Sequence, residues 1–266
     1  MSRCAADRPS VPETPHIAFT LLDENGTLLA ARQEHRPFYA ASTIKLHVLI
    51  AALRAVDAGR LDLDATVPAT RASTGRDGRV FTLDGDHLDP THPADGTPIR
   101  IRDLFHRMID RSSNEATNAV IDLIGLEAID ALLAELGLTA TRIERRIGDA
   151  SALADGLTNE TCAADLARTM NALATGALVS SASTDLALAA LRDQRIPVIA
   201  TALGPGVDIG SKSGEIERIR HDVAFIGTPG SRGSRTLAIL TSGLDERAAD
   251  EAIRALACAL VPSFAS

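Results

Sequence analysis

The chain has few cysteines. Cys4, Cys162 and Cys258 are the three in a sequence of 266 residues, and they lie far apart, with none of the short spacings typical of metal sites. Neither disulfide bonds nor a metal site is therefore implied, and no cofactor is expected. A cysteine content of this kind favours the reducing environment of the cytoplasm.

Long hydrophobic runs are absent as well. No stretch approaches the roughly 18 apolar residues that a membrane-spanning helix needs. Residues 1–15 contain Pro9, Pro12 and Pro15 and no apolar run of about seven residues, which is the minimum for the core of a signal peptide. We therefore expect a flexible N-terminal segment over residues 1–15, a cytoplasmic protein without an export signal, and no membrane partner.

Positive charge is scarce relative to negative charge. The 27 Lys and Arg residues are outnumbered by 35 Asp and Glu residues, which gives a net charge of −8, and the basic residues are scattered. Because a nucleic-acid surface needs clustered Lys and Arg to contact phosphates, no nucleic-acid partner is expected. With 45% hydrophobic residues the chain can bury a full core, as one large domain or two interleaved ones. The sequence leaves the oligomeric state open.

The most informative feature that is present is the tetrapeptide 42–45, Ser-Thr-Ile-Lys, which opens the amphipathic run 46–56. On a helix, Ser42 and Lys45 share one face, so the amine can reach the hydroxyl and accept its proton. A serine hydroxyl is nearly inert at neutral pH and needs such a base, and a desolvated lysine can serve. The alternative is structural, with Ser42 as a helix N-cap and Lys45 exposed.

Two further short motifs follow along the chain. Residues 112–114 read Ser-Ser-Asn, and residues 212–214 read Lys-Ser-Gly. In this order and at these separations, the three motifs resemble the S-x-x-K, S-x-N and K-S/T-G set of class A serine β-lactamases and penicillin-binding proteins. The flanking residues 202–206 and 220–226 are similar to that family too, and the resemblance runs from about residue 16 to the end of the chain.

The resemblance implies a role for each residue of the first two motifs. Ser42 would attack a carbonyl carbon, and Lys45 would accept its proton or pass it on. Ser112 would shuttle a proton to the leaving-group nitrogen, and Asn114 would donate to a substrate amide oxygen while holding Lys45. A structural alternative for Ser112 is a capping box, because Glu115 follows it by three residues.

The third motif would form the strand beside the nucleophile. Gly214 would let the substrate backbone approach closely, and the backbone N–H groups of Glu215 and Ser42 would form the oxyanion hole. The expected partner is a small-molecule substrate, and Lys212 and Ser213 would bind a carboxylate where the substrate carries one.

Arg220 would add positive charge for the same carboxylate, unless it is a surface arginine on a strand. Glu215 shares a strand face with Ser213 and is therefore predicted to point into the cleft. There it would repel a carboxylate, pair with Arg220 or recognise a cationic group.

Two positions depart from the family. Ser113 stands where an aspartate usually braces the loop. In segment 141–151, which aligns with the loop that carries the deacylation glutamate, Ile147 falls on the position of that base. Since isoleucine cannot deprotonate water, efficient β-lactam hydrolysis is not expected. Asp149 and Glu144 are possible substitutes for the base, although a loop-anchoring ion pair with Arg142 or Arg145 suits each of them better.

Hydrophobic periodicity indicates the architecture. An Asn-Gly turn at 25–26 predicts an opening β-hairpin over 17–31. Helical periodicity covers 101–108, 115–124, 126–136, 161–173, 184–191 and 246–260, and strand-like runs cover 207–211, 222–227 and 236–241. These elements predict an α/β (α+β) fold of the β-lactamase and transpeptidase type, with an antiparallel sheet flanked by helices. Residues 16–60 and 196–266 would form the α/β domain and residues 61–195 an inserted all-helical domain.

Three functions fit these observations. The first is a serine hydrolase that forms an acyl-enzyme on Ser42 and cleaves an amide, ester or lactam bond of a small molecule. The second is an acyltransferase, or an amide- or ring-forming enzyme of small-molecule biosynthesis, in which an amine replaces water. The third is a non-catalytic ligand-binding relative. The joint presence of five motif residues speaks against the third: Ser42, Lys45, Ser112, Asn114 and Lys212.

Overall fold

A computed structural model describes residues 14–85 and 88–265. Its largest sheet has five antiparallel strands in the order β10-β11-β12-β1-β2. Their bounds are β1 His16–Leu22, β2 Leu28–Arg32, β10 Ile209–Ile216, β11 Ile219–Ile226 and β12 Arg235–Ser242. The two ends of the chain therefore build one sheet, as the sequence predicts. Most of the predicted N-terminal segment, residues 1–13, lies outside the described residues.

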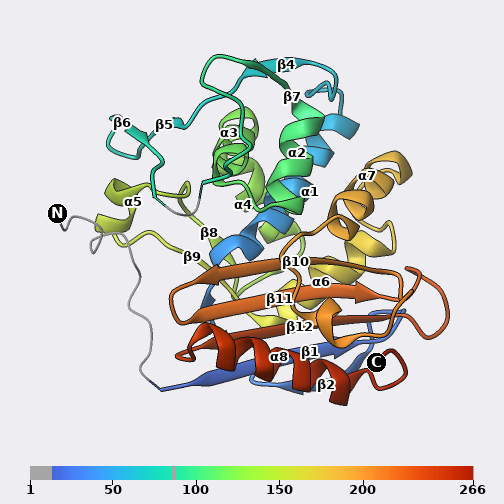
Figure 1. The fold of residues 1–266 in the computed structure, drawn as a ribbon. Coiled ribbons are helices and arrows are strands. Elements are labelled where there is room, and N and C mark those ends of the chain that lie inside the picture. Colours follow the sequence, from blue (N-terminus) through green and yellow to red (C-terminus); the bar gives the residue numbers. More distant parts are fainter. Residues whose placement is uncertain (1–13, 86–87, 266) are drawn as a thin grey trace.

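Helices cover both faces of this sheet (Figure 1). The alternation of β11 shows the division: Val223 and Phe225 pack into the core on the side of the central helices, whereas Ala224 and Ile226 pack on the opposite side with α8 (Glu246–Leu260). Because side chains alternate along a strand, both faces of β11 are buried here, and residues 223–226 are apolar throughout.

Helix α1 (Lys45–Asp57) runs through the centre of the molecule. Its side chains from Leu46 to Leu53 are almost entirely buried. It contacts the other helices of the middle of the chain, which are α2 Ile101–Asp110, α3 Asn114–Ile124, α4 Leu126–Glu135, α6 Ala163–Ala174 and α7 Ser181–Arg192. These helices match the predicted periodic segments. Because α1 is central, Lys45 at its start is buried inside the molecule.

The middle of the chain differs from the expectation of helices alone. Short paired strands occur there: β4 Thr66–Pro68 with β7 Pro98–Arg100, β5 Ala72–Thr74 with β6 Val80–Thr82, and β8 Arg142–Ile143 with β9 Asn159–Thr161, which also pairs with β3 Phe38–Tyr39. A strand of two or three residues is too short to show alternation, which is why the sequence pattern misses it. Helix α6 also packs on the sheet, although it belongs to the predicted inserted domain. The division into two domains stays a prediction.

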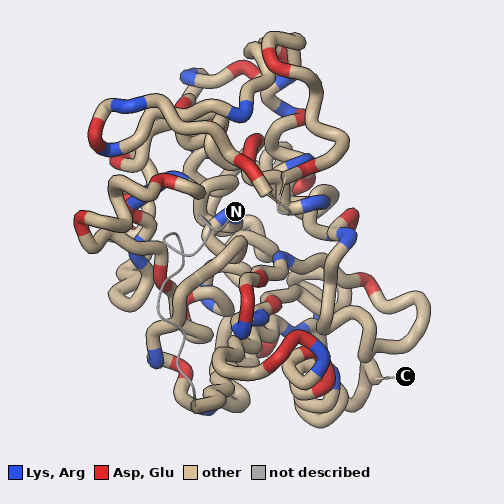
Figure 2. The backbone as a smooth tube through the Cα atoms, turned by 60° about the vertical axis from the view of Figure 1, so that its left-hand side comes forward, with Lys and Arg blue, Asp and Glu red and all other residues tan. Residues whose placement is uncertain are grey.

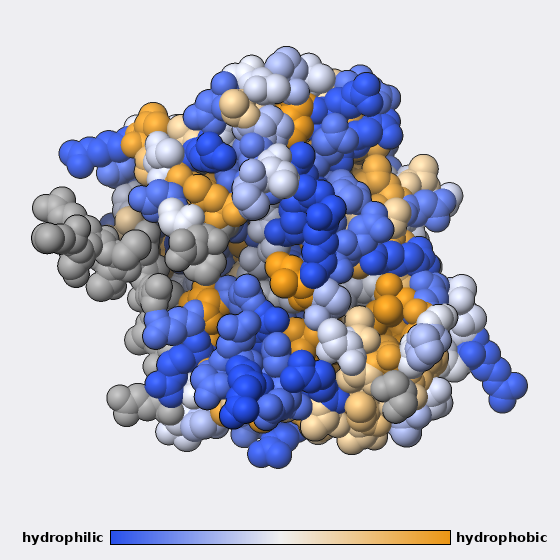
Figure 3. All heavy atoms as spheres, in the orientation of Figure 1, coloured by the Kyte–Doolittle hydropathy of each residue, from blue (hydrophilic) through white to orange (hydrophobic). Residues whose placement is uncertain are grey.

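The remaining short helices are η1 (Ala41–Ile44), α5 (Ala150–Ala154) and η2 (Ile199–Ala202). Acidic and basic residues are interspersed along the described chain (Figure 2). One face of the molecule is mainly hydrophilic, with small separate apolar patches (Figure 3). Among the described helices, none combines the length and the apolar character that a bilayer crossing requires.

Candidate active site

Ser42 lies in a strained turn between β3 and α1. Ala41, directly before it, has a φ of 47°, a region that non-glycine residues rarely adopt and that concentrates at functional sites. The Thr43 hydroxyl donates to the Ala40 carbonyl at 2.6 Å and fixes the turn. The N-cap positions of η1 and α1 are Ala40 and Ile44, so Ser42 is not a capping residue. The structural alternative for Ser42 is therefore wrong.

Lys45 is fully buried and points at the second motif. Its Nζ donates to the Ser112 carbonyl at 2.6 Å, to Ser112 Oγ at 3.1 Å and to Asn114 Oδ1 at 2.8 Å. The structural alternative required an exposed Lys45, and this is wrong as well. Asn114 holds Lys45 as the resemblance implies.

Lys212 reaches the same hydroxyl from the other side. It lies on β10 opposite Val223 of β11, and cross-strand partners share a face, so its side chain enters the core on the side of the helices. Lys212 Nζ donates to Ser112 Oγ at 3.2 Å and to the Ser213 carbonyl at 2.7 Å. The Ser112 hydroxyl is thus held between two buried amines.

Burial lowers the pKa of both amines. For Lys45, desolvation and then the neighbouring charge of Lys212 hold the pKa well below its usual range, against a smaller opposing effect of Glu115. For Lys212, desolvation lowers the pKa to about 7, while Asp222 and Asp110 act in the opposite direction. An amine with a lowered pKa is available as a base near neutral pH.

Adjacent serines have different tasks at the start of α3. Ser113, not Ser112, is the N-cap: its Oγ accepts from the Ala116 backbone N–H at 3.1 Å and its hydroxyl donates to the buried Glu115 carboxylate at 3.0 Å. The predicted capping box on Ser112 is therefore wrong. Ser112 instead has a φ of 57° and turns its hydroxyl towards the two lysines. Ser113 takes over a bracing role despite the absence of the usual aspartate.

Gly214 brings the third motif against the turn of Ser42. A Cβ at this position would lie 3.0 Å from the backbone nitrogens of Ser42 and Thr43. At Gly214 the strand therefore approaches the turn of Ser42 closely. The close approach of a substrate backbone to Gly214 stays a prediction. The glycine is needed because two backbones meet there.

The ladder between β10 and β11 orients the backbone of Glu215. The two-residue turn makes Ile216 and Ile219 a hydrogen-bonded pair, and such pairs alternate with non-hydrogen-bonded ones, so Glu215 belongs to a non-hydrogen-bonded pair. Its N–H consequently points away from β11, at the edge of the sheet next to Ser42. That orientation suits a donor to an oxyanion.

Arg220 differs from its predicted role. Its side chain is 8% exposed, forms ion pairs with Glu215 and with Asp250 of α8, and does not line the pocket. Of the three predictions for Glu215, the pairing with Arg220 is confirmed. Arg220 is already neutralised by protein carboxylates and is not positioned to bind a substrate carboxylate.

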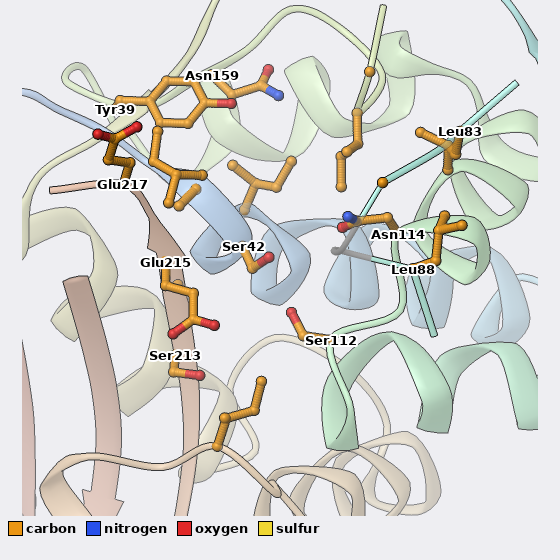
Figure 4. A pocket seen from close by; sticks show the side chains of 18 of the residues that line it. Tyr39, Ser42, Leu83, Leu88, Ser112, Asn114, Asn159, Ser213, Glu215 and Glu217 are labelled. Carbon is orange, nitrogen blue, oxygen red and sulfur yellow. The ribbon is translucent and has the colours of Figure 1, made fainter. Parts of the chain in front are cut away.

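The three motifs meet at one pocket of about 450 Å³. In Figure 4 the side chains of Ser42 and Ser112 point towards each other at its centre, Ser213 and Glu215 line one side, and Tyr39 and Asn159 lie at one end. The lining also includes Leu83, Leu88, Arg111, Asn114, Arg145, Ile147, Ile196 and Gly214. Within the described residues no group of three or more His, Cys, Asp and Glu side chains is arranged to hold a metal ion.

Comparison with known proteins agrees with this geometry. A sequence model of the family described as "Beta-lactamase enzyme family" matches residues 9–264. The chain belongs to the beta-lactamase enzyme family.

Solved structures of this family share the fold. A β-lactamase from Sphaerobacter thermophilus is 29% identical, with a TM-score of 0.79 and coverage of 95% of this chain and 94% of that one. A β-lactamase from Xanthomonas campestris is 27% identical, with a TM-score of 0.80 and coverage of 93% and 91%. PBP-A is 24% identical and shares the fold at a TM-score of 0.76, with coverage of 94% and 89%. The predicted β-lactamase-like fold is confirmed.

The backbone of Ile147 is held in place by the side chain of Asn118. Asn118 clamps its backbone from both sides: the Asn118 amide donates to the Ile147 carbonyl at 2.9 Å and accepts from the Ile147 N–H at 2.9 Å. Ile147 lines the pocket, so an apolar side chain stands at the position predicted for the deacylation base. None of the three motifs includes Asn118, although its spacing of four residues from Asn114 places both on one helix face.

The two possible replacement bases lie elsewhere. Asp149 caps α5 through the Ala152 N–H at 3.0 Å and accepts from the Arg76 N–H at 3.0 Å, so it does not pair with an arginine side chain of the loop. Glu144 forms the expected ion pair with Arg142, at 3.7 Å. Neither carboxylate lines the pocket.

Proposed function

We propose that this chain is a serine hydrolase that forms an acyl-enzyme on Ser42 from an amide, ester or lactam of a small molecule and releases the acyl group slowly. One observation carries the proposal. The Ser112 hydroxyl lies within 3.2 Å of both the Lys45 and the Lys212 amine, in the pocket that Ser42 lines.

The proposed acylation uses these groups in sequence. Ser42 Oγ attacks the carbonyl carbon while Lys45, whose pKa is lowered by burial, accepts the proton. The N–H groups of Glu215 and Ser42 stabilise the oxyanion. The proton then passes through the Ser112 hydroxyl to the leaving group, and a carboxylate on that side of the substrate would bind at Ser213.

Slow release follows from the side chain at position 147. Hydrolysis of an acyl-enzyme requires an activated water, and the loss of a general base costs about two to four orders of magnitude in rate. Ile147 offers no proton acceptor. The acyl-enzyme is therefore expected to accumulate.

The test is intact-protein mass spectrometry after incubation with benzylpenicillin or with a fluorophosphonate. Benzylpenicillin is a suitable probe because a mutant of the structural relative PBP-A was solved as an acyl-enzyme complex with penicillin G. We expect a lasting adduct of one equivalent, and no adduct in Ser42→Ala. Fast turnover without accumulation would contradict the slow release, and an absence of labelling by both reagents would favour a ligand-binding protein.

Acyl transfer to an amine is a second candidate. It is favoured by the same apolar side chain, because Ile147 cannot activate a water that would compete with the amine. If an amine is the natural acceptor, adding small primary amines to the preformed adduct should release it faster than water does. An adduct lifetime that is independent of amine concentration would leave hydrolysis as the better description.

A further inference from the structure

The pocket is lined by two arginines whose surroundings differ. Arg111 is paired with a carboxylate: its Nε donates to both oxygens of Asp110 at 3.1 Å, and its Nη2 donates to the same carboxylate at 3.0 Å. Arg145 is only 4% exposed and has no carboxylate within ion-pair distance among residues 14–85 and 88–265.

The contacts of Arg145 are all uncharged. Its Nη2 donates to the Tyr39 hydroxyl at 3.1 Å, its Nη1 donates to the Arg146 carbonyl at 3.4 Å, and its Nε is buried without a hydrogen-bond partner in the described structure. The guanidinium lies 6.0 Å from the centre of the Tyr39 ring, which adds a cation–π contact but no counter-charge. A buried cation without a counter-charge is costly to the fold unless an anion joins it.

Residues around Arg145 hold it in place without neutralising it. Asn159 accepts from the Arg145 backbone N–H at 3.3 Å and donates to the Arg145 carbonyl at 3.1 Å. Its amide is uncharged. The Tyr39 hydroxyl accepts from Arg145, so its own proton is free to donate, since no acceptor for it lies among the described residues. Arg145 and Tyr39 both line the pocket.

The position of Arg145 and Tyr39 in the pocket indicates which part of a substrate would lie near them. In Figure 4, Ser112 and Ser213 lie to one side of Ser42, whereas Tyr39 and Asn159 lie to the other. Under the proposed function, Ser112 delivers a proton to the leaving group, so the leaving group lies on its side. The acyl portion must then extend towards Tyr39.

We propose that the end of the pocket formed by Arg145 and Tyr39 binds a carboxylate on the acyl side of the substrate. This inference rests on the proposed function for the orientation of the substrate. It names a substrate class: small acyl compounds whose acyl group carries a carboxylate.

The test measures binding without chemistry. In the Ser42→Ala chain, isothermal titration calorimetry compares benzylpenicillin with carbenicillin, which has one additional carboxylate on its acyl side chain. We expect carbenicillin to bind at least about tenfold more tightly, because a charge-assisted hydrogen bond to a buried guanidinium is among the strong ones. Adding Arg145→Gln should bring the two Kd values within about twofold of each other.

Arg146→Gln is the matched control, because it removes a neighbouring positive charge that pairs with Asp122 and does not line the pocket. The preference for carbenicillin should survive this change. Equal Kd values in the Ser42→Ala chain, a preference that persists in Arg145→Gln, an equal loss in Arg146→Gln, or no binding of either compound would each overturn the inference.

Two further measurements keep the result interpretable. Thermal melting followed by circular dichroism shows whether each variant is folded. If Arg145→Gln is not folded, Arg145→Lys replaces it, and we expect it to lose most of the preference because the ammonium lacks the planar fork; a full preference would overturn the inference. Acylation of the unmodified chain by benzylpenicillin judges the proposed function separately, so either idea can fail while the other stands.

Discussion

At the scale of single residues, the position that most separates this chain from a β-lactamase with a deacylation glutamate is Ile147. Its backbone is fixed by two hydrogen bonds to Asn118, and its side chain lines the pocket. The loop therefore already presents position 147 to the site. What is missing is the proton acceptor and not the placement.

Ile147→Glu should accelerate loss of the benzylpenicillin adduct by about two to four orders of magnitude, because a carboxylate at this position can deprotonate water. The measurement is the time course of the adduct mass after removal of free penicillin. Ile147→Gln is the control, since glutamine has nearly the same shape as glutamate but is not a base. Equal rates in the two variants would show that position 147 does not act on the water.

At the scale of elements, two adjacent serines at the start of α3 differ: Ser113 caps the helix, and Ser112 lines the pocket. Ser113 satisfies the Ala116 N–H and the buried Glu115 carboxylate, whereas the Ser112 side chain contacts the two lysine amines. A helix N-terminus must satisfy its free N–H groups, and one serine of the pair is sufficient for that task. The other can then adopt the strained φ of 57° that turns it into the site.

The two serines should therefore respond in opposite ways to removal of the hydroxyl. Ser113→Ala should lower the free energy of unfolding by about 1–2 kcal/mol through loss of the cap and should retain most of the labelling rate. Ser112→Ala should change that free energy by less than about 1 kcal/mol, because both amines keep a carbonyl or amide partner. It should slow the labelling of Ser42 by about two orders of magnitude or more.

Urea denaturation and the rate of adduct formation measure the two effects. A large loss of stability in Ser112→Ala with an unchanged labelling rate would reverse the assignment of the two roles.

At the scale of the whole molecule, the site exists because segments that are remote in sequence come together. The edge strand β10 from the C-terminal part packs against the turn of Ser42 from the N-terminal part, and Ser112 comes from the middle of the chain. Gly214 allows the closest approach. The geometry of the proposed oxyanion donors, the N–H groups of Ser42 and Glu215, depends on this contact between backbones.

Gly214→Ala should slow the labelling of Ser42 at least about tenfold and cost about 1–3 kcal/mol of stability, because the new Cβ would push β10 away from the nucleophile turn. Gly75→Ala is the matched control: it also lacks a positive φ, and the nearest atoms to its Cβ are the ends of side chains. Labelling should be unaffected there. An unchanged rate in Gly214→Ala would mean that the strand can move without loss of the oxyanion donors.

The sequence by itself determined the three motifs, the helices with clear periodicity and the strands at both chain ends, because each of these is written in local spacing. It could not show which of Ser112 and Ser113 caps α3, since both precede the helix and only the packed lysines distinguish them. Likewise, the same arginine type stands at positions 145 and 220, and local sequence does not reveal the partners of either.

Only the tertiary structure decided those questions. It placed Glu215 and Asp250 on Arg220, and left Arg145 buried beside neutral groups at the end of the pocket. Local spacing sets which side chains share a face of one element, whereas burial and charge pairing depend on what another element brings to that face. The proposed reactivity depends on burial and charge pairing, because the pKa of the two amines is lowered first by their removal from water.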